Sequence, residues 1–184
     1  SLVVGEINPK VPVTFGDTFV PIADFDLLVS ATEDPIYFSR WPTDDVFDRI
    51  AAKVASEIED GSCIAFSIGP LFEALSTHLI HKRNLGVHSP FFTDALMDLV
   101  NSGAVTNRNK DMFRGKSVTS YGFGTPDLMA WLNRNPLIEF QSIDKVFSPN
   151  QIGRNEGFVC VLPARKVDLS GRVALHVGKG NVAA

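Results

Sequence analysis

The sequence LGVHSPFFTDALMDLVNSGAVTN, residues 85–107, contains the transition that decides the fold of this chain. An apolar strand at residues 85–88 breaks at Ser89-Pro90, and a helix begins near Thr93. In α/β proteins, a strand that ends in a tight turn before a helix usually opens at its carboxyl end into the crevice that holds the chemistry. This turn is therefore the first place to look for function. The predicted helix has one apolar face, formed by Ala95, Leu96, Leu99 and Val100.

Strands and helices alternate over most of the chain after residue 43, which predicts an α/β fold with a mostly parallel sheet flanked by helices. The apolar run at residues 62–68 has the length of a strand that is covered on both faces. A helix capped at residues 43–45 is expected to end at Gly61. Its predicted buried face contains Val46, Ile50, Val54 and Ile58. Further strands are predicted at residues 116–121, 137–140 and 157–162, and further helices from Gly69-Pro70, Thr125-Pro126 and Ser148-Pro149. A hairpin or an edge pair is predicted at residues 167–176.

The first 42 residues have a different pattern. Two strands are predicted there, at residues 2–7 and 25–29, the second of them buried. Residues 31–42 show no hydrophobic period and contain two prolines, so we expect a linker with a domain boundary near Pro42. We therefore divide the chain into residues 1–42 and residues 43–184, and expect it to be part of a longer polypeptide.

Composition and charge exclude several classes of protein. The net charge of −4 and the pI near 5.5 argue against nucleic-acid binding, which needs a basic surface. No apolar run approaches the length of a membrane span, and no signal peptide is visible, so a cytoplasmic location is expected. The two cysteines, Cys63 and Cys160, lie in apolar runs and are predicted to be reduced core residues.

Three predicted strand-to-helix turns share one design, and they lie at residues 68–70, 88–90 and 123–126. Free backbone N–H groups at a helix start bind a phosphate or an oxyanion, and Gly69 and Gly124 would permit close approach. Each turn taken alone is most simply an ordinary βα connection. Three such turns in one sheet favour a ligand crevice.

Few side chains near these turns are candidates for chemistry. His88 is either a general base or a hydrogen-bonded structural histidine. Glu73, in the first turn of its helix, is the one buried-carboxylate candidate, while Asp94 suits a helix cap. No metal site is proposed, because His78, His81 and His176 lack carboxylate or cysteine partners at ligand spacing. Lys179, in Gly178-Lys179-Gly180, lacks the spacing of a phosphate-binding loop.

Several motifs of the chain resemble those of a known family. The resemblance rests on GEINP (5–9), TFGDTF (14–19), IG (68–69), LGVH (85–88), Asp94, GAVTN (103–107), NPLIEF (135–140) and VDLSG (167–171). These motifs, in this order, resemble the acetyl-CoA hydrolase/transferase family, which includes the 4-hydroxybutyrate CoA-transferases. The resemblance implies two related α/β domains of the NagB/RpiA/CoA-transferase type. Residues 1–42 would then end the first domain, and residues 43–184 would form most of the second.

The resemblance also implies a catalytic mechanism, and this chain lacks one residue that the mechanism needs. In the family, a glutamate attacks the acyl-CoA thioester, CoA then forms a glutamyl thioester, and an acid accepts the CoA. That glutamate lies two residues after the histidine, where this chain has Pro90, and a site that is often asparagine aligns with Phe147. This marks an atypical member without the usual nucleophile. Glu73 and His88 are the substitute catalytic candidates, and the residues expected to contact CoA are Gly69, Ser89, Gly122 and Gly124.

Three functions compete. The first is an acyl-CoA hydrolase or CoA-transferase that acts on an acyl-CoA and a small carboxylic acid, with CoA as substrate and no permanently bound cofactor. The second is a CoA-thioester-binding homologue without glutamyl chemistry. The third, a sugar-phosphate isomerase, rests on fold analogy alone. We favour the enzyme, and expect a homo-oligomer that contacts neither nucleic acid nor membrane.

Overall fold

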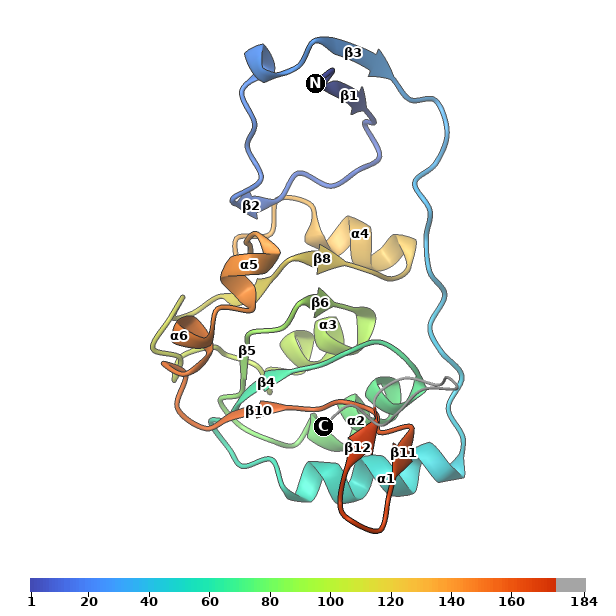
Figure 1. Cartoon of the computed structure of the whole chain (residues 1–184), viewed down its shortest axis with the longest axis vertical. Coiled ribbons are helices and arrows are strands. Elements are labelled where there is room, and N and C mark those ends of the chain that lie inside the picture. The colour runs from blue at the N-terminus through green and yellow to red at the C-terminus, as the bar shows by residue number, and fades with distance from the viewer. Residues whose placement is uncertain (175–184) are drawn as a thin grey trace.

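Parallel strands form the centre of the computed structural model, which describes residues 1–174 (Figure 1). They make two three-stranded sheets, ordered β10-β4-β5 and β2-β9-β7. A bridge between His88 and Val118, with the Ser89 N–H donating to the Val118 carbonyl at 2.9 Å, joins β5 to β7. The strands are β2 (Phe15–Gly16), β4 (Cys63–Ala65), β5 (Gly86–Val87), β7 (Ser117–Thr119), β9 (Ile138–Phe140) and β10 (Phe158–Cys160). The predicted α/β class with a mostly parallel sheet is confirmed.

Helices follow the strands where the turn residues predict them. Helices α1 and α2 pack together, and α2 packs on α3. The Asp44 carboxylate accepts from the backbone N–H groups of Val46 and Phe47, and the Thr125 hydroxyl caps α4. The helices are α1 (Asp45–Ser56), α2 (Pro70–Leu79), α3 (Asp94–Asn101), α4 (Pro126–Leu132), α5 (Ile143–Val146) and α6 (Pro149–Ile152). Of these, the short α5 was not predicted, because one helical turn has no hydrophobic period.

The buried face predicted for α1 is confirmed for Val54, which packs against the core, and for Ile58, which is fully buried, but it is wrong for the other two residues. Val46 and Ile50 are exposed by 52% and 44%, and the helix ends at Ser56, before Gly61. Phe47, Ala51 and Ala55 of the helix join Val54 in the core instead. An α-helix turns every 3.6 residues, so a strict spacing of four drifts off one face. The small alanines also let α2 approach closely, and a count of large apolar residues misses them.

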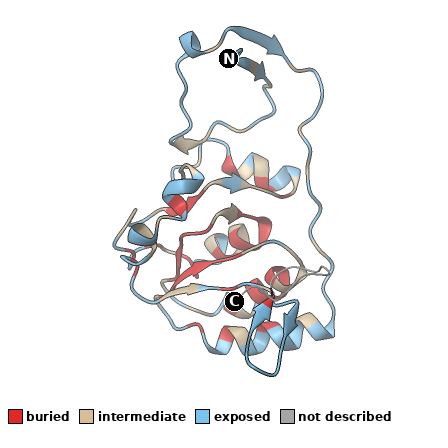
Figure 2. Ribbon diagram, in the orientation of Figure 1, coloured by how far each residue is buried: buried red, intermediate tan, exposed pale blue. Residues whose placement is uncertain are grey.

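Strand β4 is buried on both faces, as its continuous apolar sequence predicts. Its core neighbours come from all four longer helices, and Figure 2 shows this buried region between the strands and helices α2 and α3. A short parallel pair, β6 (Phe91–Phe92) with β8 (Tyr121–Gly122), was not predicted. It extends β5 and β7 beyond the turn at Ser89-Pro90, so this turn is a bend between two strands rather than a direct entry into α3.

The N-terminal strands β1 (Val4–Ile7) and β3 (Leu27–Ser30) form a separate parallel pair at one end of the molecule (Figure 1). The prediction that the second strand is buried is wrong, because Leu27 and Val29 are exposed by 50% and 41%. Figure 2 shows that no α-helix of residues 1–174 covers this pair. The apolar sequence predicted the strand, but burial needs a second layer.

The predicted linker, residues 31–42, has no regular structure and runs along the side of the molecule to α1 (Figure 1). It is nevertheless docked, because the Phe38 N–H donates to the Gly124 carbonyl at 2.9 Å and its ring packs edge-on against Phe123. Through β2, the N-terminal segment also adds a strand beside β9. The division of the chain near Pro42 stays a prediction.

Side chains of the loop between α3 and β7 satisfy the backbone groups of β5 that β7 does not pair. The Asn107 side-chain oxygen accepts from the Val87 N–H at 2.8 Å, and Lys110 Nζ donates to the Val87 carbonyl at 2.7 Å. Asn107 adopts a positive φ of 55° and is buried together with Lys110. A buried backbone group needs a partner, and this loop supplies two. The C-terminal hairpin is confirmed as β11 (Lys166–Val167) with β12 (Val173–Ala174). His176 and Lys179 lie outside the described residues.

Candidate functional site

An apolar cavity of about 320 Å³ lies at the carboxyl ends of β10, β4 and β5. The chain passes from β4 to β5, β7 and β9 in one direction, and then returns to place β10 on the other side of β4. Ligands of α/β proteins bind at such a reversal of strand order. Helices α5 and α6 contribute one wall of the cavity. Its lining residues are Ala65, Phe66, Ser67, His88, Pro90, Phe91, Val146, Phe147, Ile152, Phe158, Cys160 and Leu162.

His88 is the buried polar group of this cavity, with 1% of its surface exposed. Its Nε2 lies 2.9 Å from the Val146 carbonyl, which accepts, so Nε2 carries the proton. The other ring nitrogen, Nδ1, is buried without a partner in the structure. Burial lowers the pKa of His88 below 6.5, and nearby Lys110 lowers it further, while the Val146 hydrogen bond opposes them. The ring is therefore neutral, and Nδ1 holds a free lone pair that accepts protons.

The two departures from the family pattern, Pro90 and Phe147, both line this cavity. They lie far apart in sequence and meet here because α5 packs against β7 beside the end of β5. No carboxylate, lysine or arginine side chain of residues 1–174 is among the lining groups. The cavity therefore suits an apolar group such as an acyl chain. Its own described walls provide no glutamate.

Ser89 and Gly69 occupy different surroundings. The Ser89 hydroxyl accepts from the Phe66 N–H at 3.1 Å and donates to the Phe66 carbonyl at 2.9 Å. It therefore ties β5 to β4, and sequence reasoning did not foresee this. Gly69 caps α2 with a φ of 125°, and no atom lies within 4 Å of the position that a Cβ would take. This helix start is open, as the prediction of a binding turn requires.

Gly122 and Gly124 have packing roles. A Cβ on Gly122 would lie 3.0 Å from Leu132, and one on Gly124 would overlap the Asp94 carboxylate. Asp94 is buried and accepts from the Thr125 backbone N–H at 3.1 Å and from the Thr125 hydroxyl at 2.6 Å. The carboxylate of Asp94 therefore occupies the helix start that was expected to hold a ligand. It caps α4 across space rather than its own helix.

Glu73 is buried, as predicted, but it does not line the cavity with His88. Arg40 of the linker contacts it at 2.8 Å and also pairs with Asp98 of α3. Burial raises the pKa of Glu73, while the Arg40 hydrogen bond and charge hold it down. A paired carboxylate is a weak nucleophile. This arrangement explains Glu73 as the group that attaches the linker to α2.

We expect Arg40→Ala to lower the free energy of unfolding by about 1–2 kcal/mol at pH 7, because Glu73 is left buried and unpaired. The loss should be smaller near pH 4. Burial already places the folded-state pKa of Glu73 above its unfolded value, and without Arg40 it rises further, so the cost of the buried charge grows as pH increases. Urea unfolding at both pH values measures this. The double variant Arg40→Ala/Glu73→Gln should recover part of the loss, and an equal loss at both pH values would contradict the assignment.

The two cysteines differ in their exposure to solvent. Cys63 is buried, but Cys160 is exposed and lines the cavity, so the prediction of two core cysteines is wrong for the second. Strand β10 is at the edge of its sheet, so one side of the strand reaches solvent. Both thiols are free. Burial raises the pKa of both.

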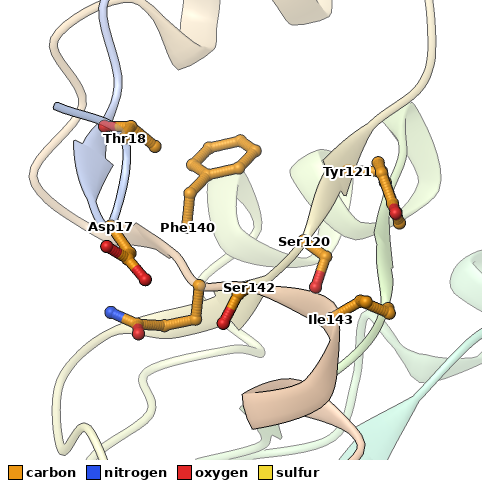
Figure 3. A pocket seen from close by; sticks show the side chains of 8 residues that line it. Asp17, Thr18, Ser120, Tyr121, Phe140, Ser142 and Ile143 are labelled. Atoms are coloured by element: carbon orange, nitrogen blue, oxygen red, sulfur yellow. The ribbon is translucent and has the colours of Figure 1, made fainter. Parts of the chain in front are cut away.

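A second, more polar cavity of about 200 Å³ lies between the N-terminal segment and the start of α5. Figure 3 shows side chains of Asp17 and Thr18 on one side of it and those of Ser120 and Tyr121 on the other. None of the predicted site residues lines it. Within residues 1–174, no group of three metal-binding side chains occurs, and no helix is long and apolar enough to cross a membrane.

Comparisons with known proteins identify relatives of this chain. Residues 124–184 match the model of the acetyl-CoA hydrolase/transferase C-terminal domain. Over 172 residues, 94% of the chain, the sequence is 36% identical to the 4-hydroxybutyrate coenzyme A transferase of Clostridium kluyveri. The chain belongs to the acetyl-CoA hydrolase/transferase family. It is also 33% identical, over 92% of its length, to the succinyl-CoA:cyclohexane-1-carboxylate CoA transferase of Geobacter metallireducens.

Solved structures of the family agree. The 4-hydroxybutyrate CoA-transferase from Porphyromonas gingivalis superposes with a TM-score of 0.89 at 29% identity, over 94% of this chain and 44% of that one. RipA from Yersinia pestis gives a TM-score of 0.90 at 26% identity, over 95% and 41%. The chain spans about 40% of the length of its Clostridium relative and 39% of its Geobacter relative. In this family the substrates are CoA thioesters.

Proposed function

We propose that the protein containing this chain acts on an acyl-CoA thioester, as an acyl-CoA hydrolase or as a CoA-transferase. The observation that carries the proposal is the apolar cavity at the strand-order reversal, in a chain of the acetyl-CoA hydrolase/transferase family. An acyl chain is the apolar part of such a substrate, and the cavity offers it apolar walls with one buried imidazole, His88.

The finer assignments belong to the same proposal. The acceptor of CoA is a small carboxylic acid, or water in the case of hydrolysis. CoA is a substrate and no cofactor stays bound. The open helix start at Gly69 remains the candidate for contact with CoA. The protein is expected to be a cytoplasmic homo-oligomer.

A second function is favoured by specific residues. Pro90 and Phe147 line the cavity, and Glu73 is held by Arg40 away from it. This supports a homologue that binds a CoA thioester without forming a glutamyl intermediate. Incubation of the full-length protein with butyryl-CoA and acetate distinguishes the enzyme from the binding protein. Release or transfer of CoA supports the enzyme, and binding in calorimetry without turnover supports the binding protein.

Filling the cavity tests whether it receives the acyl group. We expect Leu162→Trp to weaken butyryl-CoA binding at least tenfold, because the indole would occupy the space of the acyl chain. The matched control is Leu137→Trp, since Leu137 is similarly exposed, at 46% against 52% for Leu162, and lies outside the cavity. Calorimetry with butyryl-CoA and with free CoA measures the effect. Equal affinity for butyryl-CoA in the two variants would place the acyl group elsewhere.

A further inference from the structure

We propose that the Cys160 thiol accepts the acyl group from the bound thioester, with His88 as the base, so that the cavity carries an S-acylation site. This inference rests on the proposed function, because it requires an acyl-CoA in the cavity. No described carboxylate lines the cavity, so the proposal gives the role of nucleophile to the sulfur atom of Cys160.

The sheet register brings the two residues together. Cys160 pairs with Ala65 across β10 and β4, and Ile64 pairs with Val87 across β4 and β5. His88 follows directly after β5 and therefore lies beside Ala65. Its backbone N–H donates to the Ile64 carbonyl at 3.1 Å. Neighbouring strands are about 4.8 Å apart, so the two Cα atoms are separated by roughly 10 Å. Side chains in one row of a parallel sheet point to the same face, and all three line the cavity.

The residue between them leaves the space open. Ala65 has only a methyl group, so the cavity is continuous from the exposed thiol to the buried imidazole. A thioester carbonyl placed above Ala65 would lie between the sulfur and Nδ1. One water molecule spans about 6 Å between two hydrogen-bonding groups, so the proton crosses this separation from the thiol to the ring through a short chain of water molecules.

An unpartnered nitrogen atom of His88 also indicates a ligand site here. Nδ1 of His88 is buried, has no partner in the structure and belongs to a lining residue. A buried polar atom without a partner is costly, so a ligand or water that donates to it would stabilise the site. Other potential nucleophiles are less suited. The Ser89 hydroxyl is engaged by Phe66, and Cys63 lies outside the lining.

The exchange balances without an added reagent. Nδ1 accepts the proton of the Cys160 thiol, and the sulfur attacks the carbonyl carbon of acyl-CoA. The new C–S bond forms as the C–S bond to CoA breaks. The CoA thiolate leaves with the proton from the imidazolium, which restores the neutral ring. One thioester replaces another, so the acyl group stays activated, and water then releases it as the free acid and restores the Cys160 thiol.

The test uses the full-length protein incubated with butyryl-CoA at pH 7, followed by intact-mass measurement and peptide mapping. We expect one butyryl group per chain on the peptide containing Cys160, removed by neutral hydroxylamine. Cys160→Ala should lose this adduct. The matched control Cys63→Ala should keep the adduct. An acyl group on a carboxylate, or on Cys63, would overturn the proposal.

His88 is tested through the pH profile. We expect His88→Gln to form the adduct about 100-fold more slowly at pH 7, the lower end of the range for a lost general base. The rate should recover toward pH 9, as the thiolate forms without help. The charged group that acts on His88 in the structure is Lys110, and it is unchanged in this variant. Calorimetry separates the two hypotheses: binding without an adduct overturns the thiol, whereas no binding counts against acyl-CoA as the ligand.

Discussion

Gly124→Ala should lower the free energy of unfolding by about 3 kcal/mol, the upper end of the cost of adding atoms to a filled core. The added Cβ would overlap the Asp94 carboxylate and lie 2.6 Å from Leu128 Cδ2. Any movement of Asp94 breaks its two hydrogen bonds to Thr125, which cap α4. Chemical unfolding followed by circular dichroism measures the loss.

Gly103→Ala provides the control. Gly103 has a positive φ of 82°, but no atom lies within 4 Å of the position of its Cβ. Only the backbone strain should appear there, about 1 kcal/mol. Adding Asp94→Ala should reduce the further cost of Gly124→Ala, since the two share one space. If Gly124→Ala costs no more than Gly103→Ala, the carboxylate does not occupy the place that the structure gives it.

Because of Lys110, the free energy of unfolding should increase as the pH rises above 8. Burial lowers the pKa of Lys110 from 10.5 to about 8, against a small opposing effect of Cys63. Between these values the unfolded chain binds more protons than the folded chain, so the free energy of unfolding increases with pH. From pH 8 to pH 9 the expected gain is about 1 kcal/mol. Unfolding measured at half-unit steps of pH would detect it.

Cys63 sets the upper limit of this rise. Burial raises the pKa of the Cys63 thiol from 9.0 to about 11, and Lys110 partly opposes this. Above pH 9 the unfolded chain loses the thiol proton while the folded chain keeps it, which lowers the free energy of unfolding. The two contributions then oppose each other. Cys63→Ala should therefore extend the rise to about pH 10.5, the usual lysine pKa.

Removing the amine tests both its charge and its hydrogen bonds. Lys110→Met should abolish the rise between pH 8 and pH 9. It should also cost about 2 kcal/mol at pH 7, because the Val87 and Lys116 carbonyls each lose a donor. Lys53→Met on the exposed part of α1 is the control, with a change below about 0.5 kcal/mol at any pH. A flat pH profile in the unmodified protein would show that Lys110 reaches water.

Local chemistry explains which expectations were confirmed. Helix α4 begins where Thr125-Pro126 places a cap and a proline, and α2 begins after Gly69. These boundaries depend on residues within one turn, so the sequence contains all of their causes. The prediction failed for Val46 and Ile50 of α1 because the partner helix α2 decides which ridge is covered, and the small Ala51 and Ala55 lie on that ridge.

Some features of the candidate site could likewise be predicted from the sequence, and others could not. The bend at Ser89-Pro90 and the histidine before it are visible in the sequence, and both lie at the cavity. Glu73 was predicted to be buried and is buried, yet its partner Arg40 is 33 residues away in the linker. Gly124 was read as room for a ligand, and the space is taken by Asp94. Sequence spacing carries no information about such partners.

The sequence by itself determined the alternation of strands and helices, the positions of the caps and the apolar character of β4, because each depends on neighbours within a few residues. Tertiary structure alone decided that Cys160, Ala65 and His88 share one row of the sheet. The register between strands far apart in the chain follows from the packing of all layers together. A slip of one residue would turn the Cys160 thiol to the opposite face.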